Sequence, residues 1–165
     1  EYFLEKGMQP ARMLETHPSA FTLSLEQNIQ PTLEYLDEEL RLPNAREEVQ
    51  RNPAILGTNL EYNLRPTARY LLDKGYDLQD LRARHLSASL NARIRPRCEY
   101  MEKEGLAHAP TLGSLTTSSD VTFCKTHALN LSDFQEFCSS RGQQLKFSAD
   151  FDRWVKTGRH PESAP

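Results

Sequence analysis

The sequence has no long hydrophobic run, and none of its apolar stretches approaches the length of a membrane span. Its first residues show no signal-peptide pattern, so we expect any targeting segment to be absent or already removed. Its three cysteines, Cys98, Cys124 and Cys138, have no CxxC spacing, and their odd number favours a reducing compartment. No set of serine, cysteine or carboxylate residues is typical of an active site. We therefore expect no membrane partner, no small-molecule substrate, no cofactor and no enzymatic activity.

Glycine is also scarce, with 7 in 165 residues, while leucine is abundant, and this balance favours helices. Charged residues make up 26% of the chain and hydrophobic residues 38%, as in soluble globular proteins. A chain of this length is one ordinary domain or a piece of a larger protein.

One segment occurs three times, as Leu25–Leu36, Leu60–Leu72 and Leu90–Met101. The copies begin 35 and then 30 residues apart, and a period of this size predicts an array of helical repeats. The opening residues Tyr2–Met8 match Tyr70–Tyr76, so we expect the chain to begin inside the last helix of a truncated repeat. An end repeat with an uncovered apolar face would need a partner.

Within each copy, a capping residue and a proline mark where helices begin. Ser24, Asn59 and Ser89 share one repeat position, and all three are good N-cap residues. A proline follows seven residues later, which predicts a turn or break before it and a longer helix that starts at the proline. The apolar spacing then predicts one buried stripe, and Gly75 and Gly105 should end their helices. The stripe consists of Ile29, Leu33, Leu36 and Leu40, then Leu64, Ala68 and Leu71, then Ile94, Cys98 and Met101.

These patterns predict four segments: 1–8 as the end of a truncated repeat, 9–106 as repeats, 107–158 as a helical cap and 159–165 as a disordered tail. The first helix of a repeat should lie within 9–23, with Met13 and Leu14 buried and Pro18 at its end. The cap should have a loop over 107–114 and a helix from Ser118 or Ser119 to about Ala128. A capping box at Ser132 and Gln135 should start a second helix to about Arg141, and a last one should cover 149–156. The predicted fold class is an all-α, right-to-left stacked helical-repeat solenoid of about three repeats plus this cap.

Charge is unevenly spread along the chain. Residues 1–50 carry 4 basic and 10 acidic side chains, and residues 51–105 carry 10 basic and 7 acidic ones. Five arginines fall in a stretch with no acidic residue: Arg82, Arg84, Arg93, Arg95 and Arg97. Together with Arg65 and Arg69 they form a candidate anion-binding surface. Arg65, Arg93, Arg95 and Arg97 are expected at helix N-termini, where a cation opposes the helix dipole unless a phosphate lies among them.

Two other interpretations stay open. The arginines could pair with Glu61, Glu99 or the acidic front end, or face water, because charge runs are usually solvated. Cys124, His127 and Cys138 could be regarded as metal ligands, but their spacing fits no standard zinc pattern and a fourth ligand is not evident.

The repeat resembles that of the mitochondrial transcription termination factor (mTERF) family. Pro53–Leu56 followed by Leu60–Leu72 carries the resemblance best, and Leu90–Arg97 resembles the closing repeat of such proteins. Thr111–Phe123 is similar to the segment that follows it in plant and algal members. The resemblance implies a curved solenoid of paired helices, a mitochondrial or plastid location, and a basic concave face that binds double-stranded DNA or structured RNA.

With this resemblance we interpret Arg93, Arg95 and Arg97 as nucleic-acid contacts, and Arg65, Arg69, Arg82 and Arg84 stay open between nucleic acid and solvent. Family members act on transcription termination, ribosomal RNA, intron splicing or ribosome assembly. Two hypotheses follow. The chain is a nucleic-acid-binding factor of organelle gene expression, or it is a structural subunit of a large organelle assembly such as a mitochondrial ribosome, with rRNA and protein neighbours.

Overall fold

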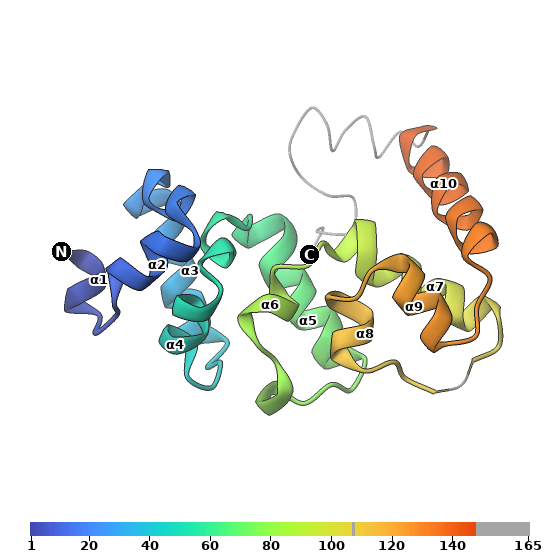
Figure 1. The fold of residues 1–165 in the computed structure, drawn as a ribbon, viewed down its shortest axis with the longest axis horizontal. Coiled ribbons are helices and arrows are strands. Elements are labelled where there is room, and N and C mark those ends of the chain that lie inside the picture. Colours follow the sequence, from blue (N-terminus) through green and yellow to red (C-terminus); the bar gives the residue numbers. More distant parts are fainter. Residues whose placement is uncertain (107, 148–165) are drawn as a thin grey trace. The chain divides into compact units, whose positions relative to one another are not determined.

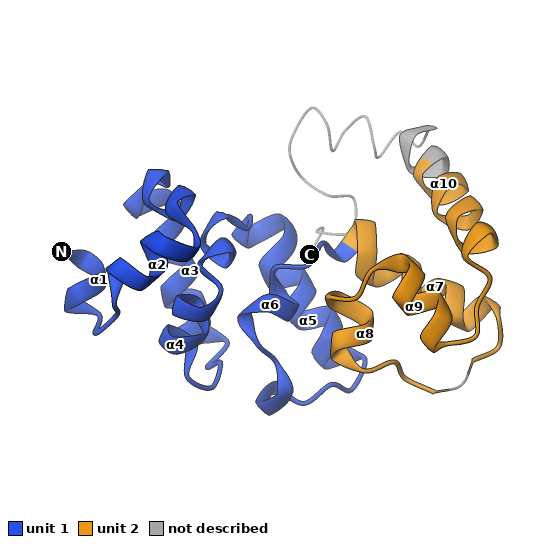
Figure 2. Ribbon diagram, viewed as in Figure 1, with its two compact units in different colours: residues 1–90 blue, residues 91–165 orange. Residues whose placement is uncertain are grey.

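The computed structural model describes residues 1–106 and 108–147, and every regular element in this part of the chain is helical. The chain divides into two compact units, residues 1–90 (unit 1) and 91–165 (unit 2), which Figure 2 shows in different colours. The all-α prediction is therefore confirmed. The helix expected over 149–156 and the tail 159–165 lie outside the described residues.

Unit 1 begins with one helical turn, α1 (Tyr2–Glu5), and continues with repeats that share one design (Figure 1). The first two repeats each have a short helix, a 3-10 turn and then a longer helix that contains π-helical turns, whereas in the third the 3-10 turn precedes the short helix. In the first repeat these are α2 (Pro10–Thr16), η1 (Pro18–Thr22), η2 (Leu25–Ile29), α3 (Gln30–Glu34) and η3 (Tyr35–Glu39). In the second they are α4 (Ala45–Arg51), η4 (Pro53–Gly57), η5 (Leu60–Leu64) and α5 (Arg65–Asp73), and the third starts with η6 (Leu78–Asp80) and α6 (Ala83–Leu86).

The repeats of unit 1 stack through equivalent elements. Helix α2 packs against α4 and η1 against η4, and α4 and η4 both pack against α6. Arg46 reinforces the first junction, because its Nη2 lies 2.8 Å from an oxygen of Asp37 in the preceding repeat. This stacking is the helical array that the period predicts.

The predicted N-caps of the longer helices are present. The side chain of Ser24 accepts a hydrogen bond from the amide of Gln27, and that of Asn59 accepts one from the amide of Tyr62. Each bond satisfies an amide that has no partner inside the helix, which explains why these residues start it.

The break predicted before each proline is absent, and this prediction is wrong. The helix continues from η2 into α3 and from η5 into α5, with Pro31 and Pro66 inside it. A proline ring would collide with the carbonyl four residues earlier in an α-helix. Here the preceding turn is π-helical, so that the amides of Gln30 and Arg65 bond the carbonyl five residues back. The wider turn accommodates the proline without ending the helix.

The apolar stripe forms the core of unit 1, with Leu36, Leu64 and Leu71 fully buried. Leu14 is 51% exposed, so its predicted burial is wrong, whereas Met13 is buried as expected. Gly75 ends α5 with a φ of 88°, a conformation that suits glycine, and the amide of Tyr76 then bonds the carbonyl of Leu71.

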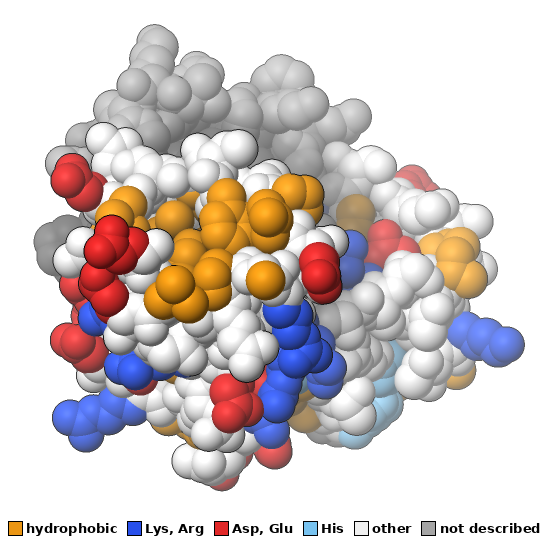
Figure 3. Space-filling model, turned by 60° about the vertical axis from the view of Figure 1, so that its left-hand side comes forward, with side chains coloured by type: hydrophobic (Ala, Val, Ile, Leu, Met, Phe, Trp, Pro, Cys, Tyr) orange, Lys and Arg blue, Asp and Glu red, His pale blue; other side chains and the backbone are white. Residues whose placement is uncertain are grey.

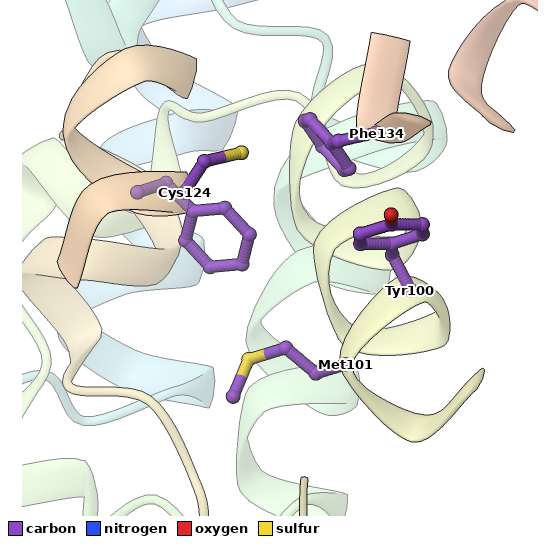
Figure 4. Close-up of a cluster of buried hydrophobic side chains, with 5 residues drawn as sticks. Tyr100, Met101, Cys124 and Phe134 are labelled. Atoms are coloured by element: carbon purple, nitrogen blue, oxygen red, sulfur yellow. The ribbon is translucent and has the colours of Figure 1, made fainter. Parts of the chain in front are cut away.

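Unit 2 is built around an aromatic cluster. Its helices are α7 (Arg95–Lys103), which continues η7 (Leu90–Ile94), and then α8 (Leu112–Thr116), α9 (Asp120–Thr126) and α10 (Leu131–Phe147). Figure 4 shows side chains of α7, α9 and α10 meeting in a common core, which consists of Tyr100, Met101, Phe123, Cys124 and Phe134. The rings of Tyr100 and Phe134 lie 5.2 Å apart, a tilted contact of the kind that aromatic pairs favour.

Two predictions for the cap need correction. The segment expected to be a loop over 107–114 already contains the start of α8 at Leu112. Helix α10 is capped by Asn130, whose Oδ1 accepts from the amides of Ser132 and Asp133, and not by Ser132. It continues past Arg141 to Phe147. The predicted start of α9 is confirmed, because the side chain of Ser119 caps it.

No helix among residues 1–106 and 108–147 is long and apolar enough to cross a membrane.

Candidate nucleic-acid interface

Arg97 is completely buried, and its guanidinium group is bonded to the end of α8, to Ser118 and to the first residue of α9. Its Nη1 donates to the carbonyls of Ser114 at 2.8 Å and Leu115 at 3.0 Å, and to the side chain of Ser118. Its Nη2 donates to the Ser118 carbonyl at 2.9 Å and to Asp120 at 2.6 Å. The last carbonyls of a helix lack intrahelical partners, and Arg97 satisfies two of them in α8. The structure therefore gives Arg97 a structural role and no free face for a phosphate.

Arg93 lies one helical turn earlier, and its side chain is exposed. Its Nη1 donates to the carbonyls of Thr116, 3.2 Å away, and Ser118, 3.4 Å away. These acceptors carry no formal charge, so they orient the guanidinium group without neutralising it. The structure thus brings Arg93 and Arg97 together at the C-terminal end of α8, one facing solvent and one facing the core.

Arg95 is half-buried at the start of α7, between these two arginines in sequence. Because η7 begins at Leu90, Arg95 and Arg97 lie beyond the first turn of this helix, and Arg93 lies at the end of that turn. The dipole argument for a phosphate among them therefore does not hold. The sequence did not reveal that η7 continues into α7 as one helix.

Arg65 is held by two carboxylates and one ring. Its Nη2 donates to Glu39 at 2.6 Å, Nη1 contacts the other oxygen of Glu39, and Nε donates to Glu61 at 3.0 Å. The guanidinium carbon lies 4.5 Å from the centre of the Tyr35 ring. Hydrogen bonding to Glu39 raises the pKa of Arg65, and the same bond lowers the pKa of Glu39. The alternative interpretation, pairing with Glu61, is present here, and Glu39 adds a link to the preceding repeat.

The other three candidate arginines of unit 1 differ in their exposure and in their bonds to other groups of the protein. Arg69 is 86% exposed, with Nε 3.8 Å from Asp73. Arg84 is exposed and donates from Nε to the ring of His85 at 3.3 Å. Arg82 is half-buried and donates to the carbonyls of Gln79 and Leu81, each at 2.6 Å. Arg69 and Arg84 therefore present the more accessible positive charges.

Unit 2 also contains a hydrogen-bonded chain that the sequence did not suggest. Ser114 Oγ lies 2.8 Å from Nε2 of His127, and Nδ1 of His127 lies 3.2 Å from Nε2 of His108. Burial, then the nearby His108 and Arg97, lower the pKa of His127, which favours the neutral form of its ring. The chain ties the residues before α8 to the end of α9. The spacing of His108 and His127 in sequence gave no signal of it.

A metal ion has no evident site in the described part of the chain. Within residues 1–106 and 108–147, no group of three or more His, Cys, Asp or Glu side chains is arranged to hold one. Burial raises the pKa of Cys124 and Cys138, which disfavours the thiolate form that metals bind.

Comparison with known proteins adds an independent finding. The mTERF family model matches residues 11–124, from α2 to within α9. No curated protein and no solved structure matches the chain. Proteins of this family are generally non-enzymatic, nucleic-acid-binding factors of organelle gene expression, in mitochondria or plastids. Because the match covers well over half of the sequence, and the repeats of unit 1 stack as the resemblance implied, the chain belongs to the mTERF family.

Proposed function

We propose that this protein binds the phosphate backbone of structured RNA or duplex DNA through arginines whose charge the protein leaves accessible. These are Arg69 and Arg84 in unit 1 and Arg93 in unit 2. The observation that carries the proposal is Arg93, which is exposed and yet held in place by two uncharged carbonyls. A guanidinium group fixed in this way loses less conformational entropy when it binds a phosphate.

The geometry of Arg93 suits a phosphate. Both of its bonds run through Nη1, so the fork formed by Nη2 and Nε is available to two phosphate oxygens. Contacts of this kind give affinity and orientation without reading the base sequence. We therefore expect binding that depends on the charge and shape of the nucleic acid more than on its sequence.

Arg65 and Arg97 are left out of the proposed contacts because their guanidinium groups are bonded within the protein. Arg82 and Arg95, which are half-buried, are kept as secondary candidates.

Charge reversal tests the proposal. Arg93→Glu, Arg69→Glu and Arg84→Glu are each compared with Arg12→Glu, which makes the same change of charge on an exposed residue of α2. Binding to a structured RNA and to duplex DNA is measured over a range of salt concentrations. Each of the three variants should lower the slope of log K against log salt by about 1, and Arg12→Glu should leave it unchanged. Equal slopes for all four variants and the unmodified protein would exclude these arginines as phosphate contacts.

A second candidate function is that of a fixed subunit in a large organelle assembly such as a mitochondrial ribosome. It is favoured by residues 1–50, where 4 basic side chains stand against 10 acidic ones. Such a surface suits a protein neighbour better than a nucleic acid. Sedimentation of organelle extract separates the two candidates. Migration with a ribosomal subunit that is lost after ribonuclease treatment would support the fixed subunit, and migration with nucleoid DNA would support the free factor.

A further inference from the structure

Unit 2 has an open cleft where α7 packs against α10. The cleft has a volume of about 410 Å³. Residues of α7, with the residue that follows it, form one wall, and residues of α10 form the other. The lining residues are Tyr100, Lys103 and Glu104, then Asp133, Glu136, Phe137 and Ser140. The last four follow one another at intervals of three, one and three residues, so they share one face of α10.

Two aromatic rings of this cleft already attract a cation of the chain itself. The rings of Tyr100 and Phe137 lie 5.2 Å apart, with an angle of 47° between their planes. Nζ of Lys103 lies 5.5 Å from the centre of the Tyr100 ring and 5.7 Å from that of Phe137. The face of an aromatic ring attracts a cation within about 6 Å. The position of Lys103 thus shows which kind of group this pair of rings favours.

The charges around the two rings favour a further cation. Glu104, Asp133 and Glu136 line the cleft and are exposed. Three carboxylates and the one ammonium group of Lys103 leave the lining with a net charge of −2. Burial, then the charges of Glu104 and Asp133, raise the pKa of the Tyr100 hydroxyl, as expected for a ring beside negative charge. The same charge repels phosphates, so the cleft suits a basic partner and disfavours nucleic acid.

Acidic side chains beside apolar ones are not sufficient for such a site. Figure 3 brings forward the side of unit 1 that carries α1 and α2, where hydrophobic side chains gather with acidic ones at their border. The exposed large hydrophobic side chains of α1, α2 and η2 are Leu4, Leu14 and Leu25. These aliphatic groups have no ring face to attract a cation. Glu15, which is exposed on α2, therefore serves as the control carboxylate.

We propose that the cleft between α7 and α10 is a docking site for an arginine side chain of a basic protein partner. A guanidinium group can lie flat against an aromatic ring while its N–H groups donate to a carboxylate, and an ammonium group lacks this planar fork. The charged and polar residues of the lining are exposed, so the cleft is open to solvent. Sites for small molecules enclose most of their ligand, whereas an open cleft suits a side chain that projects from a protein surface. Arginine is also among the residues that contribute most to binding at protein interfaces.

An NMR titration of the whole chain tests this inference. The probe is a short capped peptide in which arginine alternates with glycine. Its matched control has citrulline in place of each arginine, which keeps the shape of the side chain and removes the charge. The arginine peptide should shift the signals of residues 100–104 and 133–140, and the citrulline peptide should not. Shifts confined to other residues would overturn the proposal.

Substitutions in the cleft should change the affinity for the arginine peptide in opposite directions. Glu136→Gln should weaken binding about threefold, because it removes a carboxylate from the cleft, whereas Glu15→Gln should leave it unchanged. Lys103→Met should tighten binding about threefold, because it frees the two rings from the chain's own ammonium group. Lys125→Met removes the same charge from an exposed residue of α9 and should have no such effect. Circular dichroism verifies that each variant is folded.

The comparisons between matched variants decide the outcome. Equal affinities for Glu136→Gln and Glu15→Gln, or for Lys103→Met and Lys125→Met, would show that the peptide responds only to overall charge, and the proposal would be wrong. Spermine is titrated in parallel as a free organic cation. If spermine bound the cleft more tightly than the arginine peptide, the cleft would be assigned to a free polyamine and not to a protein side chain.

Discussion

The two units use the residue after the repeat proline in opposite ways. In unit 1 this residue is Thr32 or Thr67, and both are buried. In unit 2 it is Arg97, equally buried, with five hydrogen bonds to residues 114–120. A threonine at this position occurs in the regular repeats of unit 1, whereas the arginine of unit 2 bonds α8 and α9, which lie outside the repeat pattern. The difference between threonine and arginine at this repeat position thus coincides with the end of the repeats.

The largest effect is expected from replacing the two residues that define this contrast. Arg97→Met should destabilise unit 2 by about 3–5 kcal/mol, because it removes the donor of the Leu115 carbonyl and the stronger donor of the Ser118 carbonyl. Thr67→Val should be neutral or stabilise unit 1 by about 1 kcal/mol, because the buried Thr67 hydroxyl has no hydrogen-bond partner. Urea unfolding followed by circular dichroism measures both. The stability of Arg97→Lys, which keeps the positive charge but not the two-pronged guanidinium group, should fall between those of the other two variants. Similar losses of stability for Arg97→Met and Thr67→Val would contradict the proposed difference between the two units.

The second prediction concerns the buried histidine of unit 1. Burial, then Arg84 and Arg82, lower the pKa of His85 to about 4 from its ordinary 6.5. The unfolded chain therefore takes up a proton first as the pH falls. The stability of unit 1 should be full above pH 6.5 and decrease between pH 6.5 and 4, by up to about 3 kcal/mol.

Urea unfolding at pH 7 and pH 4.5 tests this expectation, with His85→Gln as the control. The variant should lose less stability than the unmodified protein between the two pH values. NMR titration of the His85 ring gives a direct reading, and a midpoint near 6.5 would contradict the expected burial effect. His127 in unit 2 should shift in the same direction, since burial also lowers its pKa.

A smaller effect compares how helices end in the two units. Gly75 of unit 1 ends α5 at positive φ, whereas in unit 2 Ala128, with a φ of 55°, follows α9 and allows the amide of Leu129 to bond the Cys124 carbonyl. Because an L-residue is strained there, Gly75→Ala should destabilise the protein by about 1 kcal/mol. Ala128→Gly should stabilise it by a similar amount, about 1 kcal/mol, and thermal unfolding of both variants gives the two signs. If the melting temperatures of both variants shifted in the same direction, the positive φ would not determine the stability of these two helix ends.

The sequence predicted what depends on neighbours within one repeat. Asn59 as a cap, Gly75 as a helix end and the buried stripe through Leu64 and Leu71 all follow from local spacing, and all are present. The same spacing predicted the all-α repeat fold, and the resemblance of the repeat motifs indicated the family. The π-helical turns could not be predicted from this spacing. Proline is typical of a helix start, and the sequence does not show that the turn before it is wide enough to accommodate the ring.

The candidate site was harder to predict, because its partners lie far along the chain. Arg97 bonds residues 17 to 23 positions later, in a segment outside the period, so a charge pattern could not show that it is buried. For Arg65, the partner Glu61 was visible four residues away, whereas Glu39 lies 26 residues back. Only Arg69, Arg84 and Arg93 combine exposure with positions that the sequence had proposed.

The smallest effect is expected at Arg65, whose ion pairs lie at the surface of unit 1, in contrast to the buried Arg97 of unit 2. Its side chain is 34% exposed and those of Glu39 and Glu61 are 54% and 65% exposed, so water and salt weaken these pairs. Arg65→Met should lower the melting temperature slightly at low salt, and the difference should vanish at high salt. Hydrogen bonding to Arg65 lowers the pKa of Glu39, so this contribution is present above the ordinary glutamate pKa and is lost as the pH falls through the lower folded value. Glu39→Gln should abolish that part of the acid dependence in the unmodified protein but change nothing in Arg65→Met. If Arg65→Met instead lost as much stability as Arg97→Met, and lost it at every salt concentration, the two arginines would stabilise their units in the same way. The contrast between the exposed ion pairs of Arg65 and the buried hydrogen bonds of Arg97 would then be wrong.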